Sequence, residues 1–268
     1  RVSIQPENKT ELQLTGSNTS DVYWSIPSRP NSFLNGANSY LSFTYTYTGT
    51  TPTVGGVVQV SNGTGASFIK NLETIAGSTS LELINDYNAL ACLVDDFQSG
   101  DRCKTLGNIL EDKHETDTKQ GHAREIDDVL TSGGFIQKRR ICIPLMSISV
   151  GTLQDKYMPM GTDLGMRLRL SFEAPDVALV GNDVFGGTLG YKLEDITYEC
   201  EYLDCDSSTY NSIVAEADGI LKVSGTGVSS FQTTVSAGST QNTLLIPARY
   251  SSVRNYMTII RENAAITS

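Results

Sequence analysis

Histidine and cysteine are the residues of this chain best suited to metal binding or nucleophilic catalysis, and their spacing favours neither. His114 and His122 are the only histidines, and both lie in a polar stretch that also contains Cys103. A structural zinc site usually takes closely paired ligands such as Cys-x-x-Cys, and this sequence has no such pair. It also lacks the Gly-x-Ser-x-Gly motif of a nucleophile elbow. We therefore predict no catalytic and no metal-binding residues.

The acidic and glycine-rich stretches do not have the spacing of known sites either. Asp95-Asp96 and Asp127-Asp128 lack the Asp-x-Asp-x-Asp-Gly pattern of a calcium loop. Glu194 and Asp195 are neighbours in a predicted strand, so their side chains should point to opposite faces and not act together. The stretches 161–165 and 181–190 fit no strand–loop–helix pattern for phosphate binding. We expect no cofactor and no enzymatic activity.

The charge and the cysteines limit the class of partner and the compartment. The chain has 20 Lys and Arg against 30 Asp and Glu, and its longest basic cluster is Lys138-Arg139-Arg140. Phosphate binding needs a positive stripe, so we expect no direct binding of nucleic acid. No apolar run approaches the roughly 20 residues of a membrane span. An odd number of cysteines in a long chain favours reduced thiols over a disulfide scaffold. The cysteines are Cys92, Cys103, Cys142, Cys200 and Cys205.

Alternating apolar residues predict a chain built mainly of strands. In 165–172, Met166, Leu168, Leu170 and Phe172 share one face of a predicted strand. The same period of two occurs in 40–47 and in 191–202, where the inward set ends with Ile196, Tyr198, Cys200 and Tyr202. Further strands are predicted at 10–15, 22–26, 57–60, 68–75, 80–84, 135–143 and 144–150, the last two forming a pair closed by a turn at Gly151.

A single helix is predicted, after Asp86 as N-cap. Its apolar residues recur at steps of three and four, which is typical of a helix packed on a sheet. They are Tyr87, Leu90, Ala91, Val94 and Phe97. The polar stretch 101–128 predicts a long surface excursion. The first domain is expected to end near 204–211.

A short motif occurs twice, far apart in the chain. Ile26-Pro-Ser-Arg29 precedes the strand 40–47, and Ile246-Pro-Ala-Arg249 precedes the apolar run Tyr256–Ile260. This repeat favours a duplicated β-domain. We predict a first domain at 1–210, with 211–268 as linker and opening strands of a second. The alternative is that 211–268 supplies the last strands of a single domain.

Several segments in this order resemble one protein family. They are Ser39–Tyr45, Leu81–Leu90, Ile143–Gly151, Lys156–Met160 and Leu164–Leu170. The chain resembles the major capsid proteins of tailless icosahedral viruses in the adenovirus-like, double-jelly-roll lineage. Capsid proteins of polinton-like viruses are the most similar. The resemblance covers most of residues 10–205, and its motifs concern the fold rather than any catalysis.

The resemblance implies an all-β fold: a jelly-roll β-sandwich with one short helix and long loops, the first of two tandem jelly rolls with the second incomplete here. It also implies a structural protein of the virion. Three chains would form a pseudo-hexameric capsomer that contacts neighbouring capsomers and minor or penton proteins in an icosahedral shell. An internal membrane could lie beneath such a shell. On this interpretation, 101–128 forms an outer loop or a clamp between subunits.

Two alternatives stay open. The first is a single-jelly-roll capsid or penton-type protein, in which residues 220–260 supply the last strands. In that case Tyr256–Ile260 should pair inside the main sheets. The second is a glycan-binding β-sandwich module, which would need exposed aromatic side chains beside carboxylates. Trp24, the only tryptophan, lies in an apolar strand and is predicted to be core.

Overall fold

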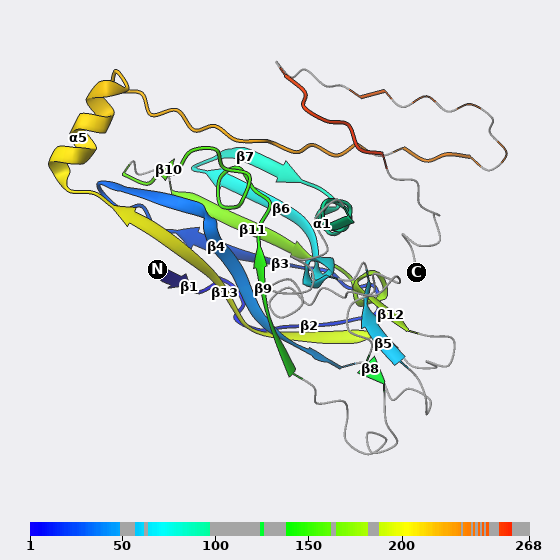
Figure 1. Cartoon of the computed structure of the whole chain (residues 1–268). Helices are drawn as coiled ribbons and strands as arrows, with labels where there is room; N and C mark the ends of the chain where they lie inside the picture. Colours follow the sequence, from blue (N-terminus) through cyan, green and yellow to red (C-terminus); the bar gives the residue numbers. More distant parts are fainter. Residues whose placement is uncertain are drawn as a thin grey trace.

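Two antiparallel sheets packed face to face form the body of the described part of the chain (Figure 1). The computed structural model describes residues 1–48, 57–61, 64–96, 124–125, 138–161, 165–181 and 188–231, and beyond these 233–236, 238, 241, 243, 245–246 and 252–258. Its strand-rich, antiparallel architecture is that of an all-β sandwich. The predicted fold class is correct at this level.

The larger sheet has the strand order β1-β13-β4-β10, with β2 also paired to β13 and β9 also paired to β4. Its longest pairing joins β4 to β13, from Tyr47 opposite Tyr191 to Ser32 opposite Asp204. The strands are β1 (Val2–Ile4), β2 (Leu12–Thr15), β4 (Ser32–Tyr47), β9 (Lys138–Pro144), β10 (Met158–Pro159) and β13 (Gly190–Asp204).

The second sheet has four strands in the order β3-β11-β6-β7. They are β3 (Ser20–Ile26), β11 (Met166–Phe172), β6 (Ile69–Ala76) and β7 (Thr79–Ile84). A small third sheet joins β12 (Leu179–Gly181), β5 (Val57–Val60) and β8 (Arg124–Glu125). The alternating faces predicted for 165–172, 40–47 and 191–202 are all buried as expected.

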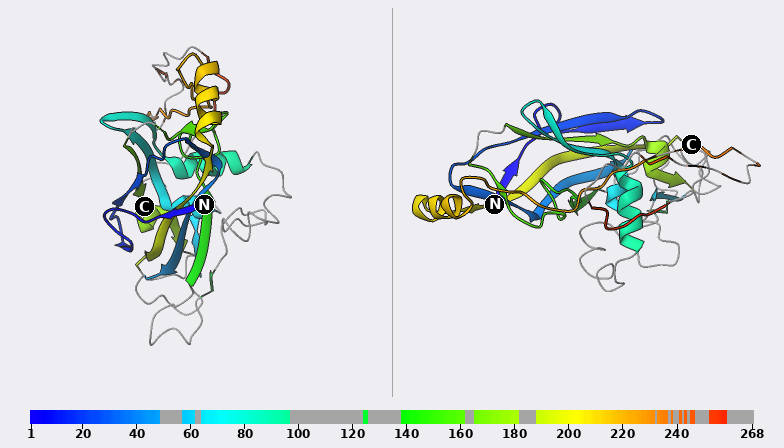
Figure 2. Two further views of the ribbon diagram at one scale, coloured as in Figure 1. Left: turned by 90° about the vertical axis from the view of Figure 1, so that its left-hand side faces the viewer. Right: turned by 90° about the horizontal axis from the view of Figure 1, so that it is seen from above.

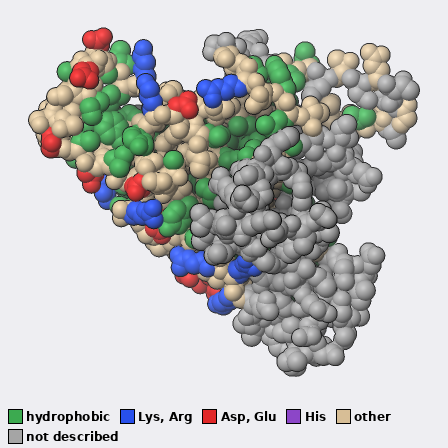
Figure 3. Space-filling model, in the orientation of Figure 1, with side chains coloured by type: hydrophobic (Ala, Val, Ile, Leu, Met, Phe, Trp, Pro, Cys, Tyr) green, Lys and Arg blue, Asp and Glu red, His purple; other side chains and the backbone are tan. Residues whose placement is uncertain are grey.

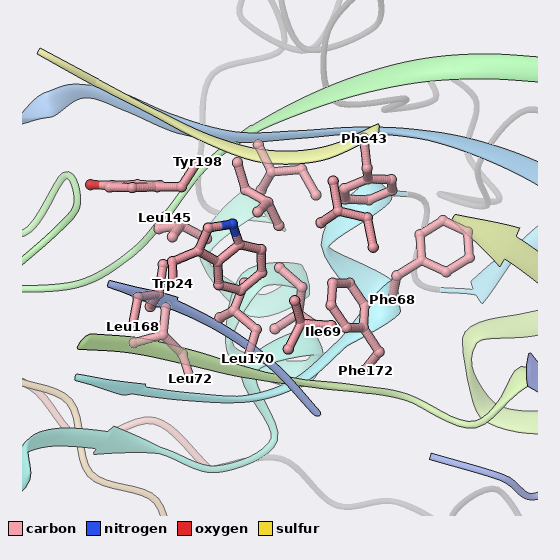
Figure 4. Close-up of a cluster of buried hydrophobic side chains, with 14 of the residues drawn as sticks. Trp24, Phe43, Phe68, Ile69, Leu72, Leu145, Leu168, Leu170, Phe172 and Tyr198 are labelled. Atoms are coloured by element: carbon pink, nitrogen blue, oxygen red, sulfur yellow. The ribbon is translucent and has the colours of Figure 1, made fainter. Parts of the chain in front are cut away.

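The core lies between the two large sheets, and aromatic rings fill its centre. Figure 4 shows Trp24, Phe43, Phe68 and Phe172 reaching into the space between the sheets. Phe68 is fully buried, with its ring centroid 4.9 Å from that of Tyr191 and 5.9 Å from that of Phe43. Trp24 is also fully buried, as the sequence predicted.

The prediction of a single helix is wrong. The expected helix is present as α1 (Tyr87–Asp96), and short turns form η2 (Gly65–Phe68) and α4 (Pro175–Ala178). A second helix of ten residues, α5 (Ser207–Glu216), stands where the sequence predicted only a domain end. Its Ser, Thr and Asn residues have low helix propensity, so composition did not reveal it. The predicted domain boundary at residue 210 falls inside this helix.

Residues 144–150 do not form the predicted second strand of a pair. The chain leaves β9 at Pro144 and continues as a series of turns. Leu145 and Val150 are fully buried, but so are the side chains of Ser147 and Ser149 between them. The turns bury these apolar side chains and also give the hydroxyl of Ser147 a buried partner, the carboxylate of Glu82.

Two expectations fall largely outside the described residues. Of the excursion 101–128, the structure describes only β8. Of the second copy of the motif, the structure describes Ile246. Of the chain that follows, it describes residues 252–258, which are not part of a strand.

Replacing Phe68 by alanine should lower the free energy of unfolding by about 3–5 kcal/mol, because a large buried ring leaves a cavity among other rings. Urea denaturation followed by Trp24 fluorescence measures this change. The matched control is Val180→Ala. Val180 is substantially exposed on β12, so this substitution should lower the free energy of unfolding by only about 0.5 kcal/mol. Equal costs for the two variants would contradict this placement of the core.

Candidate functional site

Side chains suited to metal binding do not cluster in the described part of the chain. No group of three His, Cys, Asp or Glu side chains there is arranged to hold a metal ion. Cys142, Cys200 and Cys205 are free thiols. Burial raises the pKa of Cys200 to about 11, so this thiol is a poor nucleophile at neutral pH. His114, His122 and Cys103 lie outside the described residues.

Glu194 belongs to a row of ion pairs on the outer face of the larger sheet. Its carboxylate lies 2.6 Å from the ammonium of Lys138 on β9 and 2.8 Å from that of Lys192 on β13. Lys192 in turn lies 3.0 Å from Glu11. Hydrogen bonds from Lys138 and Lys192 lower the pKa of Glu194 to about 2, so it stays ionised. Asp195 occupies an irregularity in β13 with φ +52°, and its side chain is exposed.

The outer face of the second sheet carries a similar row. Arg169 on β11 lies between Asp21 on β3 and Glu73 on β6, at 2.7 and 3.2 Å. Burial raises the pKa of Asp21, but hydrogen bonds from Ser171 and Arg169 outweigh it and leave this pKa below its ordinary value. The middle of each outer face therefore carries charges that already have partners, whereas the edge strand β7 exposes Leu81 and Leu83 on the outer face of the second sheet.

One flank of the sandwich is built differently, by the loop 145–157, which we call the flank loop. It lies between the edge strand β7 of one sheet and the strands β9 and β10 at the edge of the other. Tyr198 donates a hydrogen bond from its hydroxyl to the carbonyl of Val150 at 2.7 Å. The side-chain oxygen of Gln154 accepts from the backbone N–H of Gly36 at 2.8 Å. These bonds tie the loop to β13 and β4.

Glu82 holds the flank loop to β7. Its carboxylate accepts hydrogen bonds from the hydroxyl of Ser147 at 2.6 Å and from the backbone N–H of Ile148 at 3.2 Å. The side chain is 8% exposed. Burial raises the pKa of Glu82, and the hydrogen bonds from Ser147 and Ile148 only partly offset this effect.

An extended segment, residues 220–231, lies over the flank loop, and we call it the strap. The N–H of Asp155 donates to the carbonyl of Ser224 at 2.9 Å, and the N–H of Thr226 donates to the carbonyl of Leu153 at 3.0 Å. Gly225 lies between these two bonds, opposite Gln154. A Cβ at this position would overlap the carbonyl oxygen of Leu153. The close approach of strap and loop therefore requires glycine.

Helix α5 precedes the strap and projects beyond the end of the sandwich (Figure 2). Asp206 caps it by accepting from the N–H of Thr209 at 2.7 Å. Tyr210 contacts the ring of Phe33 on β4, with centroids 5.5 Å apart. Tyr210, Ile213, Val214 and Ala217 form an apolar stripe that is partly covered, and no residue of α5 is buried.

Exposed apolar side chains gather around this flank. Tyr157 of the flank loop is 52% exposed and Ile220 of the strap is 65% exposed. Val223 in the strap and Leu81 and Leu83 on β7 are also exposed. Figure 3 shows hydrophobic atoms gathered at the end of the molecule that carries α5, between polar and charged groups. The flank is thus the candidate functional site, as a surface for contact with other molecules.

No protein-family model matches the sequence, and no curated protein matches it closely enough to count as a relative. None of the helices in the described ranges is both long and apolar enough to cross a membrane.

Sequence reasoning did not identify the residues that build the flank. Glu82 alternates with Leu81 and Leu83, and this pattern would place the two leucines in the core and the glutamate outside. In the structure Glu82 and Ile84 point inward, because the flank loop supplies donors for the carboxylate. Gly225 is one of many glycines, and nothing in the local sequence distinguishes it.

Replacing Glu82 by glutamine should alter the pH dependence of stability. The folded-state pKa is raised above the ordinary 4.5, so the folded protein binds this proton more tightly than the unfolded chain. Lowering the pH from neutral through the raised pKa should therefore stabilise the wild type relative to Glu82→Gln, and the gain should level off below 4.5. Free energies of unfolding of both proteins between pH 7 and pH 4 measure it. A constant difference across this range would contradict the assignment.

Replacing Gly225 by valine should release the strap. Loss of backbone hydrogen bonds worth about 1 kcal/mol each should speed amide hydrogen exchange at Asp155 and Thr226 by about fivefold. The matched control is Gly227→Val, because a Cβ at Gly227 meets no atom within 4 Å. Protection that is unchanged in Gly225→Val, or equally lost in the control, would show that the strap is not held in this way.

Proposed function

We propose that this chain is a structural capsid protein that self-associates, as trimeric pseudo-hexameric capsomers, into an icosahedral virus shell. The observation that carries the proposal is the order of the strands in the two large sheets. One sheet contains β2-β13-β4-β9 and the other contains β3-β11-β6-β7.

This order supports a jelly roll. Taken along the chain, these strands are β2, β3, β4, β6, β7, β9, β11 and β13. The first pairs with the last, the second with the next to last, the third with β9, and β6 with β7. A long antiparallel ribbon folded over on itself produces this nested pairing, and such winding is typical of jelly-roll sandwiches in viral capsids and lectins.

The position of residues 252–258 favours the tandem version of the fold over the single one. A single jelly roll completed by residues 220–260 needs this segment inside one of the sheets. Its described part, Ser252 to Thr258, pairs with neither large sheet. The described part of this segment therefore gives the single-domain alternative no support, and we propose residues 211–268 as linker and opening strands of a second jelly roll.

The surface also suits a shell protein. A net charge of −10 disfavours direct contact with the genome, so we propose that the chain contacts other capsomers and minor or penton proteins instead. A membrane or an internal layer beneath the shell would separate it from nucleic acid. Trp24 gives the glycan-binding alternative no support, because its ring has no exposed face on which a sugar could stack.

The purified chain should sediment as a species with the mass of three chains, each of 29.0 kDa. Electron microscopy of the same sample should show ring-shaped, pseudo-hexameric particles or larger shells. Sedimentation over a range of concentrations is the control for non-specific association, since a closed trimer reaches a mass plateau. A monomer at every concentration would contradict the proposed function.

A further inference from the structure

We propose that a second copy of this chain packs its helix α5 against the flank formed by the flank loop and the strap. This inference rests on the proposed function, because it identifies the surfaces through which the copies associate. The two surfaces differ, so the contact is head-to-tail, and such contacts close into rings when the rotation between copies allows it.

The outer faces of both sheets are poor candidates for this contact. Burying the row of Glu11, Lys192, Glu194 and Lys138 would remove water from charges whose partners are already in place. The same holds for Arg169 and its two acidic partners on the other sheet. Removing water from these charges would cost more free energy than the existing ion pairs would return. The cores of protein interfaces are accordingly poor in charged residues.

The exposed apolar groups of the sandwich favour the flank. Among the described residues up to 231, and apart from Val180, the large apolar side chains that are exposed lie on β7, on the flank loop or on the strap. Tyr157 and Ile220 have the most open side chains among them. Apolar surface concentrated at one place is typical of a protein contact site.

Helix α5 needs further packing. Isolated helices shorter than about 12–15 residues are marginal in water, and α5 has ten residues, several with low helix propensity. Tyr210 packs on Phe33, but Ile213, Val214 and Ala217 are only partly covered. A neighbouring apolar surface would bury the rest of this stripe.

Charge complementarity identifies the occupant as a second copy. Glu216 and Asp218 are exposed at the C-terminal end of α5, which has no basic residue in its last turn. The flank carries Lys156 on the flank loop, next to Asp155, and Lys222 on the strap, two residues before Ser224, and Asp155 and Ser224 are hydrogen-bonded to each other. Arg254 adds a further positive charge by donating to Thr226 at 3.0 Å.

The basic groups of the flank therefore outnumber its acidic Asp155. Glu216, Asp218, Lys156 and Lys222 form no ion pair with another described residue of their own chain. They remain available for a neighbour with the same sequence. An acidic, apolar helix end then meets a basic, apolar flank.

Charge reversal on the full chain tests this contact by sedimentation equilibrium. The double variants Lys156→Glu with Lys222→Glu, and Glu216→Lys with Asp218→Lys, should each raise the dissociation constant of the assembly by about tenfold. The chain with all four reversals should assemble like the wild type, because its charges are complementary again. Lys9→Glu, an exposed change elsewhere, is the control and should leave the constant unchanged. All four positions are exposed, so unfolding midpoints should stay near that of the wild type apart from a small loss at residue 218, where φ is +52° and Asp is better tolerated than Lys, and circular dichroism checks this.

The outcomes separate this inference from the function on which it rests. If the wild type assembles and both double variants assemble equally well, the flank faces another part of the chain or another protein, and the inference is wrong. Weakened double variants without recovery in the fourfold variant would also overturn it. If the wild type remains a monomer at all concentrations, the proposed function itself fails.

Discussion

Pairing between strands far apart in the chain is the constraint on which the whole structure depends. Trp24 on β3 lies opposite Leu168 on β11, and Leu14 on β2 lies opposite Tyr191 on β13. Each such pairing closes a long loop, which costs conformational entropy before any contact compensates for it. The compensation comes from the inward faces of both sheets, where rings such as Phe68 are fully buried. Neither sheet could persist without the other.

This constraint also determines where the surface is available for contacts. Pairing occupies the interior strands of each sheet, and ion pairs such as Lys138–Glu194 and Arg169–Asp21 lie on the outward faces. The open side between the sheet edges is closed by the flank loop, which Glu82 and Tyr198 hold from opposite sheets. The strap and α5 lie outside this closure. This arrangement supports the proposed association through the flank.

The alternation of side chains allowed most strands to be predicted, but not their continuity. In β13 the buried apolar side chains are at odd-numbered positions up to Leu193 and at even-numbered positions from Ile196 on. The change occurs where Asp195 has a positive φ. In β4 the strand begins at Ser32, well before the predicted start at residue 40, through a stretch containing Asn35 and Gly36. Irregularities of this kind depend on the partner strand, so a period of two along one segment does not reveal them.

The sequence by itself determined which residues form the core faces of the long strands, because burial of alternate apolar side chains is a local property of the chain. It also determined that the chain is acidic and that no metal or nucleophile motif is present. Only the tertiary structure decided the inward position of Glu82, the turns of residues 145–157, and the need for glycine at 225. Each of these depends on hydrogen-bond donors, acceptors or backbone brought close by distant segments, and no local pattern encodes that proximity.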